Sequence, residues 1–424
     1  MKGKWGNLML MLASTLLAYG FFEFMVWRPN LMLIPLALHQ QLGFLDILAQ
    51  PSKSRTIPQG GYVAIVGDSY AEGLGDHLMK VIRQGNPDFN AGHFLHRSTG
   101  REVLSFGYRG GQPAWTYTYE MTAALHGINR YDGIELPPAG DVIAYFYEGN
   151  DVNDLMSSLH FGRPEWMTAD MIGDRNAAHR YLTELGEAGR KRAFRRWHLL
   201  ANAHLADTAG HLVKLAWKNL SRNNGPVLAA EDPSFRGGHY QEDWSRYEAS
   251  KDFVMAGGDK VPYPAPTVEP FVFHSAEELE LAQLYFEESL AYLKTLFPGA
   301  KVHVIYIPSP INAYPLAQPD IAISDRIRMP NNAERQGAVV RVSAHALAAV
   351  SNATCERIRI AAAAVGVELT DARPALRTAA QRDGYLHGPL DPGHLNLKGY
   401  QALAGVLEDA LSGRAVKGCV PLPE

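Results

Sequence analysis

A serine, a histidine and an aspartate in this sequence have the types and spacing of a nucleophile with its base. The motif Gly67-Asp68-Ser69 follows a short apolar run, and Asp391 and His394 lie three residues apart near the C-terminus. A serine hydroxyl is a poor nucleophile until an adjacent base takes its proton. His394 can take that proton, and Asp391 can accept a hydrogen bond from the other ring nitrogen and so select the tautomer. These residues indicate acyl-group chemistry at Ser69. The plain alternative is that Asp68 or Ser69 only caps a helix.

Acyl transfer also needs hydrogen-bond donors for the oxyanion of the tetrahedral intermediate. The backbone amides of Ser69 and Gly110 and the side-chain amide of Asn150 are the candidates. Gly107 and Gly111, in the same glycine-rich turn, are the alternatives to Gly110. Losing one such donor typically costs about 3–4 kcal/mol of transition-state stabilisation. Each motif alone is a common turn, but their joint position after apolar runs favours a site.

Five apolar runs predict the strands that would position these residues. The runs are continuous rather than alternating, which suits strands that are buried on both faces of a parallel sheet. Helical patterns at 275–297, 340–364 and 397–411 lie between or after them. Strands that alternate with helices predict a three-layer α/β/α, flavodoxin-like parallel sheet, with its chemistry at the carboxyl ends of the strands. The runs are 62–66, 102–106, 141–147, 301–307 and 366–370.

The rest of the chain divides into segments around this sheet. The α/β domain is expected at 60–150 and 275–424. Residues 151–274 interrupt the strand–helix rhythm and predict a large, mainly helical insertion or cap, too long for an ordinary loop. Aromatic residues within it either bind sugar rings or pack the insertion against the sheet. They are Tyr240, Trp244, Tyr247 and Tyr263.

The N-terminus predicts export. Residues 8–27 are mainly apolar, carry a single charge at Glu23 and are long enough to cross a bilayer, and Lys2 and Lys4 place the short N-terminal flank in the cytoplasm. Residues 1–28 are therefore a membrane anchor, or alternatively a signal sequence that is cleaved near Ala18-Tyr19-Gly20. A buried helix of a soluble domain is the third interpretation. Residues 29–59 form a juxtamembrane segment and linker.

Composition limits the partners. A net charge of −4 over 424 residues provides no general attraction to nucleic acid, and no nucleic-acid partner is expected. Cys355 and Cys419 are too few for a disulfide framework, and a single disulfide and two free thiols both remain open. His93 and His96 lack a third ligand at suitable spacing, so no metal is expected.

The motifs resemble those of the SGNH hydrolases, the superfamily also called GDSL esterases and lipases. The family's first block normally reads Gly-Asp-Ser, as residues 67–69 do, although Tyr70 stands where leucine is usual. Its last block, Asp-x-x-His, is met by Asp391 and His394. The resemblance covers residues 60–150 and 298–412.

The two middle blocks match less fully. The third block, Gly-x-Asn-Asp in many members, corresponds to residues 148–151, which contain Asn150. The second block supplies the oxyanion glycine, here aligned to Gly110, but Ser105 stands where an asparagine often precedes it. The resemblance implies a catalytic triad of Ser69, Asp391 and His394. It also implies an oxyanion hole of Ser69, Gly110 and Asn150, and no cofactor.

The sequence as a whole predicts a serine esterase that works through an acyl-enzyme outside the cytoplasmic membrane. An O-acylated carbohydrate is the first expected substrate and a lipid ester the second. The alternatives are an O-acyltransferase that modifies an envelope polysaccharide and a non-catalytic carbohydrate-binding protein on a hydrolase fold. The location is expected to be single-pass in the membrane with a periplasmic or extracellular domain, or secreted if the leader is cleaved.

Overall fold

The structure is a computed structural model that describes residues 2–131, 134–195, 242–267, 269–270, 274–324, 327–328, 334–335 and 339–422. Its centre is a five-stranded parallel sheet in the order β11-β6-β3-β1-β2. Numbered along the chain, this is the 2-1-3-4-5 order of flavodoxin-like sheets. The strands are β1 (Tyr62–Gly67), β2 (Val103–Gly107), β3 (Ala139–Tyr147), β6 (Lys301–Ile307) and β11 (Glu368–Asp371). All five predicted strands are confirmed, within two residues at each end.

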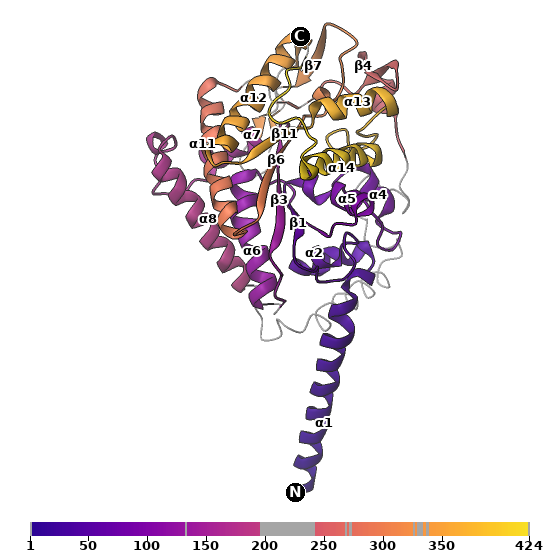
Figure 1. Ribbon diagram of the computed structural model, residues 1–424, viewed down its shortest axis with the longest axis vertical. Coiled ribbons are helices and arrows are strands. Elements are labelled where there is room, and N and C mark those ends of the chain that lie inside the picture. The colour runs from indigo at the N-terminus through magenta and orange to yellow at the C-terminus, as the bar shows by residue number, and fades with distance from the viewer. Residues whose placement is uncertain are drawn as a thin grey trace.

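Alternate side chains of the sheet enter two separate cores. Ala64 and Val66 of β1 pack into one apolar cluster, and Val63 and Ile65 pack into the other. Helices cover both faces (Figure 1), consistent with three α/β/α layers. The first cluster contains residues of α6 (Met121–His126), α7 (Asp151–Phe161), α8 (Arg175–Arg195), α11 (Ala276–Leu296) and α12 (Ala344–Ala364). The second contains residues of α3 (Ser69–Glu72), α5 (Ala91–Thr99), α13 (Arg373–Asp383) and α14 (Leu397–Ser412).

Shorter elements surround the sheet. The antiparallel pairs are β4 (Asp252–Ala256) with β5 (Asp259–Tyr263), β7 (Asp320–Ser324) with β10 (Val339–Ser343), and β8 (Ile327–Arg328) with β9 (Glu334–Arg335). The short helices among the described residues of the domain are α4 (Asp76–Val81), η5 (Trp115–Glu120), η6 (Gly127–Tyr131), η7 (Ala169–Met171), α10 (Ser245–Glu248) and η10 (Ile311–Ala313).

The prediction of helix from residue 340 was wrong for the first four residues. They belong to β10, which pairs with β7, and α12 begins only at Ala344. The side chain of Ser343 accepts a hydrogen bond from Ala346 N and caps the helix. Val340–Ser343 alternates apolar and polar residues, and this two-residue period is typical of a strand.

The N-terminal helix extends away from the domain (Figure 1). It comprises α1 (Lys2–Phe21), η1 (Phe22–Trp27) and η2 (Arg28–Leu33). Trp5–Leu33 is long and apolar enough to cross a membrane, and only 6% of its apolar window is buried. The interpretation as a buried core helix is therefore wrong. The juxtamembrane segment (residues 29–59) continues through η3 (Leu36–Gln41), η4 (Gly43–Leu45) and α2 (Asp46–Ala49).

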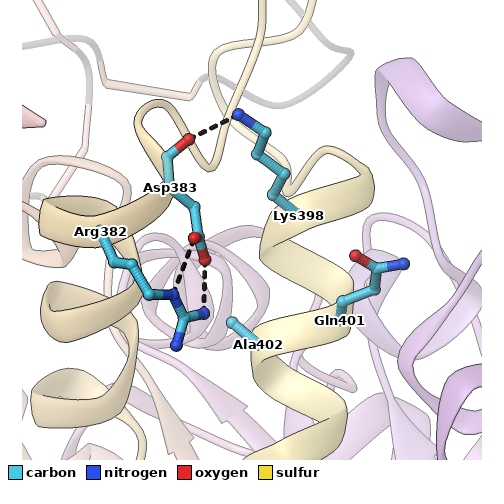
Figure 2. Close-up of a pocket in the computed structure, with 5 residues that line it drawn as sticks. All are labelled: Arg382, Asp383, Lys398, Gln401 and Ala402. Atoms are coloured by element: carbon cyan, nitrogen blue, oxygen red, sulfur yellow. Dashed lines mark hydrogen bonds and ion pairs between the residues drawn. The ribbon is translucent and has the colours of Figure 1, made fainter. Parts of the chain in front are cut away.

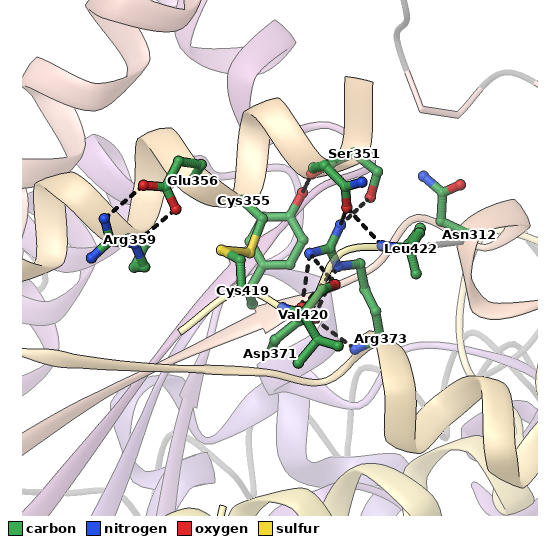
Figure 3. Close-up of polar contacts among 12 residues, drawn as sticks. Asn312, Ser351, Cys355, Glu356, Arg359, Asp371, Arg373, Cys419, Val420 and Leu422 are labelled. Carbon is green, nitrogen blue, oxygen red and sulfur yellow. Dashed lines mark hydrogen bonds and ion pairs between the residues drawn. A yellow bond between two sulfur atoms is a disulfide. The ribbon is translucent and has the colours of Figure 1, made fainter. Parts of the chain in front are cut away.

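Cys355 and Cys419 form a disulfide that attaches the C-terminal tail to α12 (Figure 3). The same tail receives further support from a buried ion pair. Arg373 donates from Nε and Nη2 to Asp371 and from Nη2 to Val420 O, and Val420 N donates to Asp371 Oδ2. Disulfides persist in oxidising compartments, so this bond suits an exported chain.

Part of the predicted insertion lies within the described residues. Trp244 stacks on Tyr385, while Tyr247 and Tyr263 are buried. These three aromatic side chains therefore serve packing. Tyr240 lies outside the described residues, as do residues 196–241 generally. The boundaries of the insertion and of the other segments stay a prediction.

Candidate active site

Ser69 begins α3 directly beyond the carboxyl end of β1. The residue that caps this helix is Asp68, whose Oδ1 accepts a hydrogen bond from Tyr70 N at 3.0 Å. Asp68 Oδ2 lies 3.4 Å from Ser69 Oγ. Because Asp68 meets the capping requirement, the hydroxyl of Ser69 is left for another partner.

That partner is His394. Its Nε2 lies 2.9 Å from Ser69 Oγ, and its Nδ1 lies 2.8 Å from Asp391 Oδ2. With the ring proton on Nδ1 donated to Asp391, Nε2 can accept the hydroxyl hydrogen of Ser69. The side chains of His394 and Asp391 are 20% and 25% exposed and are partly open to solvent, whereas Ser69 is buried.

Asp76 holds the loop that carries Asp391 and His394. Its carboxylate accepts hydrogen bonds from Leu390 N at 2.9 Å and from Asp391 N at 2.7 Å. Gly75, with a φ of +138°, lies against the backbone of Leu395, and a side chain at this position would collide with that backbone. The turn before α4 therefore fixes the position of the loop that carries Asp391 and His394.

Two tyrosines hold the same loop from the other side. The hydroxyl of Tyr70 donates to Gly393 O at 2.9 Å, and the hydroxyl of Tyr147 is 3.4 Å from the same oxygen. Their rings lie 4.2 Å apart, and the Tyr70 ring is 5.5 Å from His394. The Tyr147 hydroxyl also binds the Glu269 carboxylate. Glu269 therefore brings a second carboxylate toward the histidine.

The electrostatics of the site favour a histidine that readily takes a proton. Burial alone would lower the pKa of His394, but the carboxylates of Asp391, Glu269 and Asp68 outweigh it and raise the pKa. Burial would raise the pKa of Asp391, but the neighbouring histidine outweighs it, and the pKa is lowered. Asp391 is therefore ionised when His394 accepts a proton.

Two further carboxyl groups below Ser69 have raised pKa values. Burial raises the pKa of Asp68 to about 6. Burial and the charge of Asp68 raise the pKa of Asp151 well above its ordinary value. Asp151 Oδ2 accepts from Tyr147 N at 2.8 Å and so binds the start of α7 to the end of β3.

Asn150 and Gly110 lie on the two sides of Ser69. They follow β3 and β2, the two neighbours of β1 in the sheet. Asn150 is the N-cap residue of α7 but makes no side-chain cap, and its Oδ1 is buried without a partner among the described residues. Gly110 is exposed, with a φ of +74° in the left-handed region that glycine favours. Both residues therefore lie at the carboxyl edge of the sheet, after the strands that flank β1.

The glycines beside Gly110 have packing roles. Gly107 pairs with Gly67 at the strand ends, and a side chain there would collide with the backbone of α3. A side chain at Gly111 would meet Thr116. The loop is attached to α3 by Arg109, whose Nε lies 3.0 Å from each carboxylate oxygen of Glu72.

A separate open pocket of about 370 Å³ lies between α13 and α14 (Figure 2). None of the predicted site residues lines this pocket. It is lined by Lys398, Gln401 and Ala402 and by the ion pair between Arg382 and Asp383. The described part of the chain contains no cluster of three or more metal-ligating side chains. His93, considered above, is buried and accepts a hydrogen bond from Phe89 N.

The structure thus brings Ser69, His394 and Asp391 into contact. The sequence analysis missed the supporting residues Tyr70, Tyr147, Asp76 and Glu269. Tyr70 had a signal, because it directly follows the serine where the family usually has leucine. Glu269 had none, because it lies in the segment interpreted as an insertion.

Comparison with known proteins adds no relative: no protein-family model matches the chain, and no curated protein matches it.

Proposed function

We propose that this protein is a serine esterase of the SGNH type that acts through an acyl-enzyme. The observation that carries the proposal is the hydrogen-bonded chain from Ser69 Oγ to His394 Nε2 and from His394 Nδ1 to Asp391, at 2.9 and 2.8 Å. The 2-1-3-4-5 strand order and the site's position beyond β1 support it, since ligands bind at this edge of such sheets.

The first half-reaction forms the acyl-enzyme. His394 Nε2 takes the proton of Ser69 as Oγ attacks the ester carbonyl carbon, and Asp391 stabilises the resulting imidazolium. The oxyanion receives hydrogen bonds from Ser69 N, Gly110 N and the Asn150 amide. His394 then gives its proton to the leaving alcohol as the carbon–oxygen bond of the ester breaks.

The second half-reaction regenerates the serine. Water gives a proton to His394 and attacks the acyl carbon, and the proton returns to Ser69 Oγ as the acid leaves. The partial exposure of His394 supports water as the acceptor, because transfer to a sugar requires that water be kept out. We therefore favour hydrolysis over acyl transfer.

Export and anchoring complete the proposal. The Trp5–Leu33 helix, with lysines at positions 2 and 4, and the Cys355–Cys419 disulfide support a single-pass anchor with the domain outside the membrane. The proposed substrate is an O-acylated carbohydrate, with a lipid ester as the competing class.

Product analysis tests this function. The full chain in detergent, incubated with acetylated oligosaccharide in ¹⁸O-water, should release acetate that contains ¹⁸O. An additional unacetylated sugar should not collect the acetyl group. Transfer to that sugar without acetate release would contradict hydrolysis and support the acyltransferase. Binding of the sugar without any turnover would contradict both enzymes.

A further inference from the structure

We propose that the domain holds the Ser69 site turned away from the bilayer that carries α1, so that it acts on esters in the aqueous space and not on lipid esters of that bilayer. The inference rests on the proposed function and selects between its two substrate classes. Three features carry it: the end of the anchor, the docking of the juxtamembrane segment, and the direction of the strands.

The anchor ends in a charged pair close to the domain. Trp5 to Trp27 covers about 34 Å at 1.5 Å per residue, close to the roughly 30 Å of a bilayer core. Arg28 Nε then lies 3.4 Å from Glu23 Oε1, and the hydroxyl of Tyr19 donates to Glu23 Oε2 at 3.1 Å. Aromatic and basic residues of this kind are typical of the membrane–water interface. The bilayer surface therefore lies near Trp27 and Arg28.

The juxtamembrane segment is packed on the domain and is not a free linker. Leu31, Leu45 and Leu48 are fully buried and belong to the same apolar cluster as one face of the sheet. Asn86 Nδ2 donates to Met32 O at 2.8 Å and to Ala49 O at 2.6 Å. These contacts fix the orientation of the domain relative to the end of the anchor.

This segment lies at the amino ends of the strands. Val103 N, at the start of β2, donates to Ser52 O at 2.8 Å, and Ser52 Oγ donates to Val103 O at 2.7 Å. Gly61 N, just before β1, donates to Pro138 O, just before β3. The end of the sheet that faces the anchor is therefore the end opposite to the site.

Ser69 lies beyond the carboxyl end of β1. Six extended residues, Tyr62–Gly67, rise about 20 Å. Along the long axis of the molecule, α2 of the juxtamembrane segment lies between α1 and α14, the helix that follows His394 (Figure 1). The site is thus separated from the bilayer by the length of a strand plus the docked segment.

This separation decides the substrate class. The ester groups of a membrane lipid lie at the interface, where its acyl chains stay buried in hydrocarbon. To reach Ser69, such an ester group would have to move about 20 Å or more out of the bilayer. This movement would pull the acyl chains of the lipid out of the membrane. An ester on a soluble molecule or on a polymer that extends from the surface meets no such barrier.

Tethered esters test the proposal. The full chain is placed in vesicles that carry one fluorogenic acetate ester, attached to a lipid headgroup either directly or through an extended spacer of about 50 Å. The long-tethered ester and a free soluble ester should be hydrolysed at least tenfold faster than the directly attached ester. The matched variant has twenty Gly and Ser residues inserted between Trp27 and Arg28, which gives a reach of about 25 Å. It should recover hydrolysis of the directly attached ester and leave the rate on the free ester unchanged.

Each outcome is decisive. Equal rates on the two tethered esters by the natural chain would overturn the fixed orientation, as would failure of the chain to stay with the vesicles. Failure of the linker variant to hydrolyse the directly attached ester would also overturn it. The orientation of the domain would then not be what keeps this ester from Ser69. Loss of all turnover, the free ester included, together with no labelling of Ser69 by a serine-reactive phosphonate, would contradict the proposed function itself and the inference with it.

Discussion

Ser69 and His394 lie 325 positions apart in the chain, yet His394 Nε2 is 2.9 Å from Ser69 Oγ. The contact joins the turn after the first strand of the sheet to the loop before the last helix. Asp76, Tyr70 and Tyr147 hold that loop through its backbone. The chemistry proposed for Ser69 therefore also depends on residues that position the His394 loop, and these can be tested separately from the triad.

Asp391→Asn should keep the fold and lower kcat by about 10⁴-fold, because an amide at this position stabilises the wrong imidazole tautomer. The matched control is Asp383→Asn, which changes a partly exposed carboxylate paired with Arg382. The control should keep full activity. The measurement is kcat on a soluble acetate ester, with circular dichroism to verify folding. Full activity in Asp391→Asn would remove this residue from the triad.

Glu269→Gln should shift the acidic limb of the pH–rate profile to lower pH. Activity requires neutral His394, and its pKa is raised by Asp391 and Glu269 against the effect of burial. Removing the Glu269 charge lowers that pKa, so the histidine stays neutral in more acidic solution. Glutamine keeps an acceptor for the Tyr147 hydroxyl.

The readout for this variant is kcat/KM from pH 4 to 8, which reports the pKa values of the free enzyme. Glu408→Gln, which alters a surface carboxylate that pairs with Arg414, is the control and should leave the limb in place. If the acidic limb of the pH–rate profile does not move, or moves to higher pH, in Glu269→Gln, this carboxylate does not act on His394.

Asp76→Asn should reduce activity by one to two orders of magnitude while Ser69, His394 and Asp391 are all present. The two carboxylate oxygens accept from Leu390 N and Asp391 N, and the new NH₂ group would face one of these donors. An unmet buried hydrogen bond costs about 1–3 kcal/mol. Single-turnover acylation rates measure the effect. A rate equal to that of the natural chain would show that the loop keeps its position without Asp76.

Replacing both Cys355 and Cys419 by serine should lower the free energy of unfolding by about 4 kcal/mol, the value expected for a closed loop of 64 residues. The triad lies elsewhere, so kcat at 25 °C should be unchanged. Urea unfolding with and without reductant measures the change. If reductant destabilises the natural chain no more than the double variant, the disulfide does not form in the protein.

The apolar runs predict the sheet well because strands buried on both faces leave a continuous apolar signature. Val63 and Ile65 face one core while Ala64 and Val66 face the other, so every position of β1 is apolar. The first residue of a helix is harder to predict from the sequence. Val340 looked like part of a helical pattern, but its strand pairing with Ile323 depends on a segment distant in sequence.

The residues of the candidate site also differ in how well the sequence predicts them. Ser69, Asp391 and His394 were predictable because their types and short motifs carry a chemical meaning. Asp76 and Glu269 were not predictable, because their function comes from backbone donors and a tyrosine hydroxyl that only the folded chain brings near. The juxtamembrane segment is a similar case: residues 29–59 were predicted as a juxtamembrane segment and linker, whereas Leu31 and Leu48 are buried in the domain.

The most direct measurement of the central claim is labelling of the full chain by a fluorophosphonate, read by intact mass. The account predicts one label per natural chain, none on Ser69→Ala, and full labelling of Ser412→Ala, which removes a serine hydroxyl bonded within α14. Peptide mapping should place the phosphonate on Ser69. A folded natural chain that takes no label, or takes it equally in Ser69→Ala, would contradict the claim that Ser69 is an activated nucleophile.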